Sequence, residues 1–564
     1  MKRLITKLTL TCTLLALSAL GAFQAPAAQA ADAKPVVVVS LAGYDALRQD
    51  LSYIGGLAGV PKLAELGEGF LAQVTQGNGL DGLDKKKPIG AAAFFSGEGR
   101  PSGYIFIPIE DADKLLDSLQ NFVVDLEDQG EGYSTFKLKK GQTLTLRETK
   151  GWAFVAMNKE QLADVPADPA ALLGNLPKAY DVAVKVNISA LPDETIEQAI
   201  AQMRVGAAQA MKKAAGENDE KAEALSKAMT ESMLKQIEQG LKDLDAYTIG
   251  LAIDGAGHSL YLDVQVDMKD GSQLAGQLND AAKNAKPLTL PGLADAARIF
   301  NMYVNSPIAG DDAKNVVKLL EDGRKIAADK IDEKGDEEEA KKLQKKLLDA
   351  VIDVAVATVE EGQISGGATV SGEGPYALVA GFQVVDAKKL EEVLKDVIEV
   401  VSKDPNAPEF DVDADTKSGI TYHTVALPGI DDEEKAENAE KFFGTDELTL
   451  AIGFGDKKIV IAIGDDPIVA ADEVVNAKPK SLPGKDVPLQ MQVKLGPPLK
   501  MAADKADGQP ALKLIVDALA ETDNDHVSLT ARLIKNGERV RFEIEEGILA
   551  AFGKAIKAAS QGGR

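Results

Sequence analysis

Three aspartates at alternate positions, Asp411, Asp413 and Asp415, are the best candidates for metal binding in this sequence. Carboxylate oxygens suit a hard cation such as calcium, and alternate residues of a strand share one face. A calcium-binding loop that began at Asp411 would need a glycine and a glutamate where the chain has Thr416 and Tyr422. The pattern therefore favours a solvated acidic strand face. A cation site is the alternative, and any metal ligands stay unknown at this stage.

Signatures of other catalytic chemistry are missing from the sequence. The histidines His258, His423 and His526 are far apart, and none belongs to a zinc-binding His-Glu-x-x-His motif. The chain has no Gly-x-Ser-x-Gly elbow, and no Gly-x-Gly-x-x-Gly opens a helix after a strand. We therefore predict no catalytic residue, no cofactor and no cofactor-binding residue. A hydrolase that works through two carboxylates is a weaker alternative, because such a pair meets only in the folded chain.

The tetrapeptide Ser-Gly-Glu-Gly occurs twice, at 96–99 and at 371–374, each time between two apolar runs. Glycine adopts the positive φ angles of a tight reversal, so each copy is predicted to be a β-hairpin loop. A phosphate-binding loop is the alternative. Neither copy has the Gly-Lys-Ser/Thr of such a loop, and another strand comes before the next helix.

The segments that follow the two tetrapeptides repeat each other in register. The apolar alternation of 105–109 recurs at 380–384, and the helical pattern that begins near Asp111 recurs near Asp386. Period-2 alternation followed by a helical pattern is typical of an antiparallel sheet with one buried face. The sequence thus predicts an α+β fold of two tandem similar domains, each a mainly antiparallel sheet covered on one side by helices, with long helical hairpin insertions.

Proline and glycine residues near 287–292 mark the predicted boundary between the two repeats. The first α+β repeat is placed at 31–290 and the second at 291–564. Apolar residues at helical spacing predict a helical hairpin over about 192–244 in the first repeat and a helical insertion over about 311–360 in the second. Methionines in the first hairpin suit an adaptable partner surface, but burial against the sheet of the same repeat is favoured.

Residues 1–30 are predicted to be a secretory signal peptide. Basic residues precede an apolar run, and Ala28-Gln29-Ala30 fits the small-x-small cleavage pattern. The run is too short for a membrane anchor, which is the alternative. Cleavage would remove Cys12, the one cysteine of the chain, so the mature protein is expected to lack disulfides and thiol chemistry.

The formal net charge of the chain is −25, which disfavours binding to nucleic acid and to anionic membrane surfaces. No segment beyond the signal peptide is long and apolar enough to cross a bilayer. We therefore expect an exported protein, periplasmic or extracellular, that has no nucleic-acid partner and is not an integral membrane protein after signal cleavage.

The repeated units at 96–123 and 371–398, the signal peptide and the composition rich in Ala, Asp and Lys resemble uncharacterised exported bacterial proteins of the planctomycete cell-envelope type. The resemblance implies export and transfers no site residue. We expect a non-enzymatic envelope or secreted protein with a binding or structural role, whose partner is an unknown envelope or extracellular protein or ligand. A small-molecule or calcium-binding periplasmic protein and a carboxylate-dependent hydrolase are the alternatives.

Overall fold

The computed structural model describes residues 34–562 apart from 96–100, 122, 139–140, 215–233, 236, 334–337, 373, 406, 430–431 and 506–509. The predicted signal peptide and the first Ser-Gly-Glu-Gly loop therefore lie outside the described residues. So does most of the second arm of the helical hairpin predicted over 192–244.

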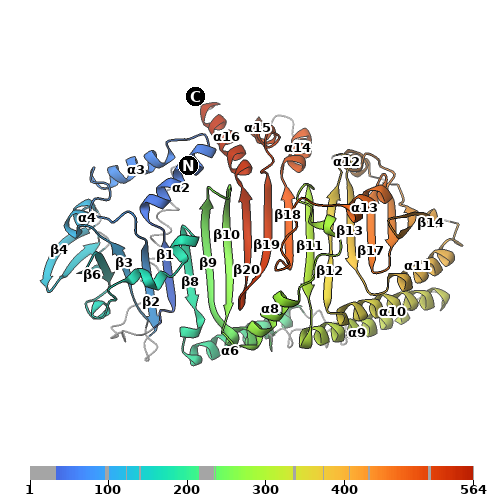
Figure 1. The fold of residues 1–564 in the computed structure, drawn as a ribbon, viewed down its shortest axis with the longest axis horizontal. Helices are drawn as coiled ribbons and strands as arrows, with labels where there is room; N and C mark the ends of the chain where they lie inside the picture. Colours follow the sequence, from blue (N-terminus) through green and yellow to red (C-terminus); the bar gives the residue numbers. More distant parts are fainter. Residues whose placement is uncertain are drawn as a thin grey trace.

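Twenty strands form one antiparallel sheet that runs along the long axis of the molecule (Figure 1). The strands up to residue 268 are β1 (Val37–Leu41), β2 (Ile89–Phe95), β3 (Pro101–Pro108), β4 (Val123–Gly130), β5 (Tyr133–Leu138), β6 (Thr143–Thr149), β7 (Trp152–Ala156), β8 (Val182–Asn187), β9 (Leu244–Asp254) and β10 (Ser259–Met268). Those from residue 300 are β11 (Phe300–Pro307), β12 (Gln363–Ser371), β13 (Ala377–Gln383), β14 (Phe410–Lys417), β15 (Ile420–Ala426), β16 (Thr449–Phe454), β17 (Lys458–Gly464), β18 (Leu489–Lys494), β19 (His526–Ile534) and β20 (Gly537–Glu545).

The two sets of strands are connected in the same order. Across the first half of the sheet the pairing runs β4-β5-β6-β7-β3-β2-β1-β8-β9-β10. The second half runs β14-β15-β16-β17-β13-β12-β11-β18-β19-β20. Each strand of the first half thus has a strand in the same topological place in the second half, ten further along the numbering.

The two halves join edge to edge where β10 pairs with β20, the last strand of each half. The antiparallel ladder runs from Ser259 opposite Glu545 to Asp267 opposite Gly537, with Asp263 opposite Arg541 at its centre. The preceding hairpin has the two-residue loop Lys535-Asn536, and Asn536 takes a φ of 55°. Asparagine before glycine suits such a turn, whose twist matches that of the strands. The strands of the two halves therefore form one continuous sheet, whereas the sequence predicted a separate sheet for each repeat.

Most helices connect the strands at matching places in the two halves, although a helix joins β15 to β16 where a four-residue connection joins β5 to β6. Those up to residue 284 are α2 (Tyr44–Leu57), α3 (Leu63–Val74), α4 (Ala112–Ser118), α5 (Leu176–Ala179), α6 (Asp193–Ala214) and α8 (Gln273–Asn284). Those of the second half are α9 (Gly310–Glu333), α10 (Glu338–Glu360), α11 (Ala387–Val401), α12 (Glu433–Phe443), α13 (Pro467–Asn476), α14 (Gly496–Lys505), α15 (Pro510–Leu519) and α16 (Glu546–Gly562). Short 3-10 turns η1 (Glu160–Leu162), η2 (Pro169–Leu173), η3 (Ile188–Ala190) and η4 (Pro291–Ala294) complete the connections.

The order of these elements explains the two long helical segments of the sequence. The insertion at 311–360 forms α9 and α10 between β11 and β12, the place that α2 and α3 occupy between β1 and β2. Helix α6 follows β8, just as α14 and α15 follow β18. Both halves therefore have helices at both of these connections, and the helices differ in length. The longest helices are the ones that the sequence pattern made visible.

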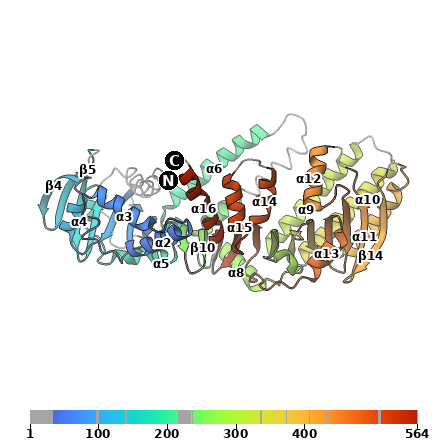
Figure 2. The same ribbon diagram turned by 90° about the horizontal axis from the view of Figure 1, so that it is seen from above.

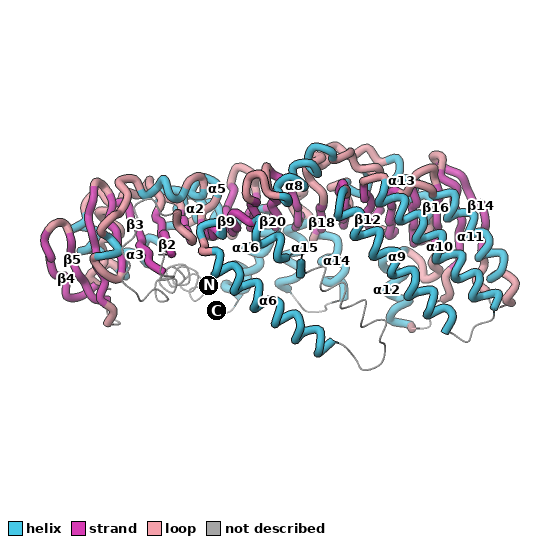
Figure 3. The backbone as a smooth tube through the Cα atoms, turned by 90° about the horizontal axis from the view of Figure 1, so that it is seen from below, coloured by secondary structure: helices cyan, strands magenta, loops and turns pink. Residues whose placement is uncertain are grey.

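Helices lie on both faces of the sheet, which differs from the prediction of helices on one side. Helices α6, α9, α10, α14, α15 and α16 lie on one side of the strands, whereas α5, α8 and α13 lie on the other (Figures 2 and 3). We call the first side the apolar face, because Leu529 and Phe542 point to it, and the second the polar face, because Asp263 and Arg541 point to it. Alternate residues of each strand belong to opposite faces.

The outermost strands of the sheet are β4 and β14, and each is distorted. The ladder of β4 with β5 shifts register after Val124, and that of β14 with β15 shifts after Asp411. Asp125 and Asp413 take φ angles of 54° and 57° in these bulges. A β-bulge bends its strand away from a regular ladder.

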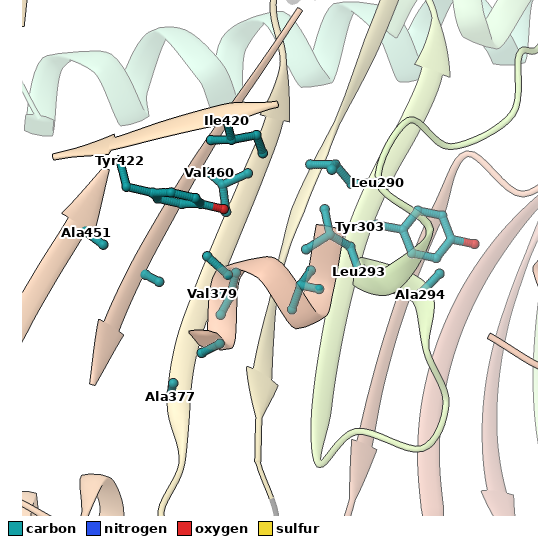
Figure 4. Close-up of a cluster of buried hydrophobic side chains, with 14 of the residues drawn as sticks. Leu290, Leu293, Ala294, Tyr303, Ala377, Val379, Ile420, Tyr422, Ala451 and Val460 are labelled. Atoms are coloured by element: carbon teal, nitrogen blue, oxygen red, sulfur yellow. The ribbon is translucent and has the colours of Figure 1, made fainter. Parts of the chain in front are cut away.

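Each half of the sheet has its own apolar core. These two cores lie on the side of the sheet that carries α5 and α13, which is the polar face of the central strands. In the first half, Phe106 packs edge to face with Trp152 and in a tilted arrangement with Phe154, in a cluster that includes residues of η1 and η2. In the second half, Leu293 of η4 packs with Val379 and with residues of α13 (Figure 4). None of the buried clusters among the described residues contains residues from both halves.

Candidate functional site

The three predicted aspartates lie on β14 but do not converge on one point. The bulge directs Asp413 toward Lys395 of α11, with 2.8 Å between Oδ1 and Nζ. Asp415 instead accepts a hydrogen bond from the Thr416 backbone and lies 3.4 Å from the ammonium group of Lys417. The triplet therefore does not form a shared cation site on one strand face.

Asp413 belongs to a different cluster, with Glu391 and His423, whose ligand atoms all lie within 4.8 Å of one another. The ammonium group of Lys395 occupies the space between the carboxylates, 2.9 Å from Glu391 and 2.8 Å from Asp413. Hydrogen bonds to Asp413 and Glu391 raise the pKa of Lys395. A metal ion would have to displace this lysine, so the cluster carries its own cation.

His423 is held neutral at the base of this cluster. It is 2% exposed, and its Nδ1 accepts a hydrogen bond from the backbone N–H of Asp413 at 3.0 Å. Burial and the positive charge of Lys395 lower the pKa of His423 in spite of the nearby carboxylates. The acceptor role of Nδ1 places the ring proton on Nε2. The histidine thus orients the β14 bulge.

The other two histidines have separate structural partners. His258 lies in the β9–β10 turn, and its Nδ1 is 2.9 Å from Glu546, which also accepts a hydrogen bond from Tyr53. His526 is buried, with Nδ1 2.9 Å from Glu545 and Nε2 2.9 Å from the Ala296 carbonyl. The three histidines do not meet.

A pair of carboxylates, Asp50 of α2 and Asp181 before β8, was not identified from the sequence. Burial, a hydrogen bond to Asp181 and the negative charge of Asp181 raise the pKa of Asp50 to about 7. Asp181 also accepts a hydrogen bond from the backbone N–H of Ile253 at 2.7 Å. Asp50 therefore keeps its proton to a higher pH than an ordinary aspartate and can donate it to Asp181, an arrangement of two carboxylates that is also found in acid–base catalytic pairs.

Replacing Asp50 with asparagine is expected to make the protein more stable at pH 8 by about 1 kcal/mol and equally stable at about pH 3.5, below the unfolded-state pKa of the carboxyl. The folded state keeps a proton on Asp50 that the unfolded state releases above about pH 4, so the free energy of unfolding of the unmodified protein falls as the pH rises toward 7. Asparagine donates the same hydrogen bond to Asp181 without titrating. Urea unfolding at both pH values measures the difference, and Asp45→Asn on the same helix is the control. An unchanged pH slope in Asp50→Asn would contradict the raised pKa of Asp50.

A pocket of about 510 Å³ opens on the polar face above β18, β19 and β20. Its floor and walls consist of Ala294, Ala296, Ser481, Leu482, Pro483, Val487, Gln490, Gln492, Ser528, Thr530, Arg532, Arg539, Arg541, Glu543 and Glu545. The charged residues at 539–545 alternate along β20 and therefore share one face. This alternation of arginine and glutamate in the sequence is the signal that could have found the pocket.

Beside the pocket lies a buried ion pair at the junction of the two halves. Asp263 is 0% exposed and accepts hydrogen bonds from Nε and Nη2 of Arg541 at 2.8 and 2.9 Å. The Tyr180 hydroxyl donates to Asp263 at 3.2 Å, and the Arg541 guanidinium stacks 3.5 Å from the centre of the Tyr261 ring. The pair is thus fully satisfied, and it fixes the register of β10 against β20.

The apolar face carries exposed side chains over the same strands. Residues in directly opposed positions on five neighbouring strands form a row that we call the apolar row, namely Leu262, Phe542, Leu529, Met491 and Met302. Each of them is between 37% and 40% exposed. Contiguous exposed apolar surface of this kind marks an interaction site more often than chance.

The helices that border this face also expose apolar side chains, among them Phe552 and Ile556 of α16, Leu514 of α15 and Val205 of α6. None of the described helices is long and apolar enough to span a bilayer. The apolar surface is therefore shared by a sheet and several helix ends.

Comparison with known proteins does not identify the pocket or the apolar row as a known type of site. No family model matches the sequence, and no curated protein or solved structure is significantly similar to it. The function is consequently argued from the geometry of the two faces of the sheet.

Proposed function

We propose that this chain is an exported, non-enzymatic binding protein that holds an acyl chain or a similarly elongated apolar ligand on the apolar row. We further propose that its two halves arose by duplication of one α+β unit, for which the identical pairing order of β1–β10 and β11–β20 is the support. The observation that carries the proposed function is the exposure of five large apolar side chains in one line.

The dimensions of the apolar row favour an elongated ligand. Neighbouring strands lie about 4.8 Å apart, so five strands span roughly 20 Å. Half the hydrocarbon thickness of a bilayer, which one acyl chain fills, is about 15 Å. An acyl chain laid across the strands would thus contact the row from Leu262 to Met302 along its length.

The chemistry of the row favours the same class of ligand. Its members offer no hydrogen-bonding groups, and the paired strands beneath leave no free backbone edge for an added peptide strand. Burial of apolar area is therefore the driving force, at about 25 cal/mol per Å². The net charge of −25 disfavours docking on an anionic membrane, which suits a carrier of single molecules.

Replacing Phe542 with glutamate is expected to weaken binding of fluorescently labelled palmitate by about tenfold or more, because a carboxylate would be desolvated at the centre of the row. Fluorescence titration of the mature full-length chain measures the affinity. Phe542→Leu should retain most of it. Leu66→Glu, which makes the same change at a more exposed leucine of α3 outside the apolar row, is the control.

Equal affinity of Phe542→Glu and the unmodified protein would reject the apolar row as the binding surface. Failure of the unmodified protein to bind labelled palmitate at all would reject the acyl-chain class. In both cases the melting temperature of each variant must stay within a few degrees of the unmodified protein, because Phe542 also packs between its strand neighbours.

A further inference from the structure

We infer that the pocket above β18, β19 and β20 binds a small zwitterion with a carboxylate at one end and an ammonium group at the other, such as a short peptide with free termini. The pocket lies on the polar face, so the inference is independent of the proposed function of the apolar row.

The carboxylate end is assigned to Arg539. Arg532 and Arg539 stand directly opposite each other on β19 and β20, and both line the pocket. Directly opposed like charges destabilise a sheet unless an anion lies between them. Arg532 is compensated by a hydrogen bond to Asp486. The ion pair that the structure gives Arg539 among the described residues is a longer one, with Asp263.

The nearest carboxylate to Arg539 is Asp263, with 3.8 Å between Nη1 and Oδ2. Both oxygens of Asp263 already accept hydrogen bonds from Arg541. Three guanidinium groups therefore share two carboxylates, and the fork of Arg539 remains for a ligand carboxylate, to which arginine binds through two parallel hydrogen bonds.

The ammonium end is assigned to Glu543. Glu545 also lines the pocket, but it is neutralised by His526, whose Nδ1 lies 2.9 Å away. Although burial opposes it, the hydrogen bond to Glu545 raises the pKa of His526 and so favours its charged form. Glu543 forms no ion pair among the residues that the structure describes. It is the lining carboxylate left for a cation.

The separation of the two ends fits a peptide of about three residues. Arg539 and Glu543 are four residues apart on β20, or about 13 Å along the strand. Three extended residues span about 10 Å, and the two side chains cover the remainder. The pocket volume of about 510 Å³ is within the range of sites for small ligands, roughly 300–1,000 Å³.

Buried polar atoms next to the pocket floor support a polar occupant. Tyr303 and Asn301 of β11 stand directly opposite the lining residues Gln490 and Gln492. They are 1% and 0% exposed, and neither the Tyr303 hydroxyl nor Asn301 Oδ1 forms a hydrogen bond among the described residues. The Tyr303 hydroxyl points away from the rest of its apolar cluster (Figure 4). Buried polar atoms are almost always hydrogen-bonded, so these atoms indicate a polar ligand or the water that accompanies it.

At the matching place in the first half of the sheet, aromatic side chains fill the space that the pocket occupies in the second half. The Tyr180 ring lies on Gly250 of β9 so closely that a Cβ atom at Gly250 would be 2.4 Å from it. Tyr261 packs against Tyr180 with 6.4 Å between ring centroids. The matching strands of the second half carry Thr530 and Gln490 under open space instead. The two halves have the same topology, but they differ at this place: the second half has the pocket, and the first half has tyrosine side chains.

Isothermal titration of the mature full-length protein with tri-alanine tests the inference. We expect binding of tri-alanine, and binding at least about tenfold weaker for tri-alanine amide and for N-acetyl-tri-alanine, since each lacks one charge. Arg539→Gln should bind tri-alanine about tenfold more weakly and no longer distinguish it from its amide. Glu543→Gln should no longer distinguish it from the acetylated form. Lys535→Gln, in the adjoining turn and outside the pocket, should behave as the unmodified protein.

Arg539→Lys keeps the charge without the fork and should give intermediate affinity, which separates loss of the site from misfolding. The melting temperature of Arg539→Gln should match or exceed that of the unmodified protein, because the opposed charges are relieved. Absence of tri-alanine binding by the unmodified protein would overturn the inference. So would an Arg539→Gln variant that still distinguishes tri-alanine from its amide.

Discussion

Replacing Asp263 with alanine is expected to lower the free energy of unfolding by about 3–5 kcal/mol, the usual effect of removing one partner of a buried ion pair. Asp263 is fully buried and accepts two hydrogen bonds from Arg541 and one from Tyr180. Its loss leaves the Arg541 guanidinium buried beside Arg539 without a bidentate partner. Because β10 and β20 form the junction of the two halves, we expect the loss to appear as a lower urea midpoint for the whole chain.

Two further variants identify the cause of that loss. Asp267→Ala removes a carboxylate from the same face of the same strand but from no buried ion pair, and it should change stability by less than about 1 kcal/mol. The double variant Asp263→Leu with Arg541→Met replaces the pair by apolar groups and should recover most of the stability. If Asp263→Ala and Asp267→Ala unfold at the same urea concentration, the ion pair does not hold the junction.

Replacing Leu293 with alanine is expected to lower the free energy of unfolding by about 2–5 kcal/mol, as for other buried leucines. Leu293 lies in η4, directly after the segment near 287–292 that was predicted to be the boundary between the repeats, and it is 0% exposed. It packs in the main apolar cluster of the second half with Val379 and Val474 (Figure 4). The segment that connects the halves is therefore part of a core, and a cavity there destabilises the second half directly.

Calorimetric scans of Leu293→Ala measure this effect. Leu482→Ala on the same face is the control, because Leu482 is 52% exposed and little area is lost on its removal. A Leu293→Ala transition that coincides with that of Leu482→Ala would show that η4 contributes only a connection and no core packing.

The sequence predicted the strands far better than their arrangement. The alternation Leu260, Leu262, Val264 and Val266 is the pattern of a strand with one buried face, and these residues do lie in β10. It also suggested that the apolar side is the buried one, yet Leu262 is 37% exposed while Asp263 on the opposite side is 0% exposed. Alternation determines which residues share a face, but the pairing of β10 with β20 and the covering loops decide which face is enclosed.

The acidic triplet is visible in the sequence, but the surroundings of Asp413 are not, for a similar reason. Asp413 does lie near other ligand-type groups, but Asp415 has separate partners, and the register of β14 against β15 shifts between Asp411 and Asp415. Glu391 and Lys395 belong to α11, a separate element that precedes β14 in the chain. No short sequence spacing therefore links them to Asp413. The Asp50–Asp181 pair likewise forms only when α2 packs near β8.

An open sheet has two free edges, and each could add a strand of another molecule and so begin end-to-end polymerisation into a ribbon. In this sheet both edge strands have the same features that oppose such pairing. Strands β4 and β14 are bent by Asp125 and Asp413 in left-handed conformations, and each carries further carboxylates along its exposed length. Bent, like-charged edges do not pair with one another. The acidic triplet that first suggested calcium thus lies on one of two bent, acidic edge strands, and both strands oppose the addition of a further strand.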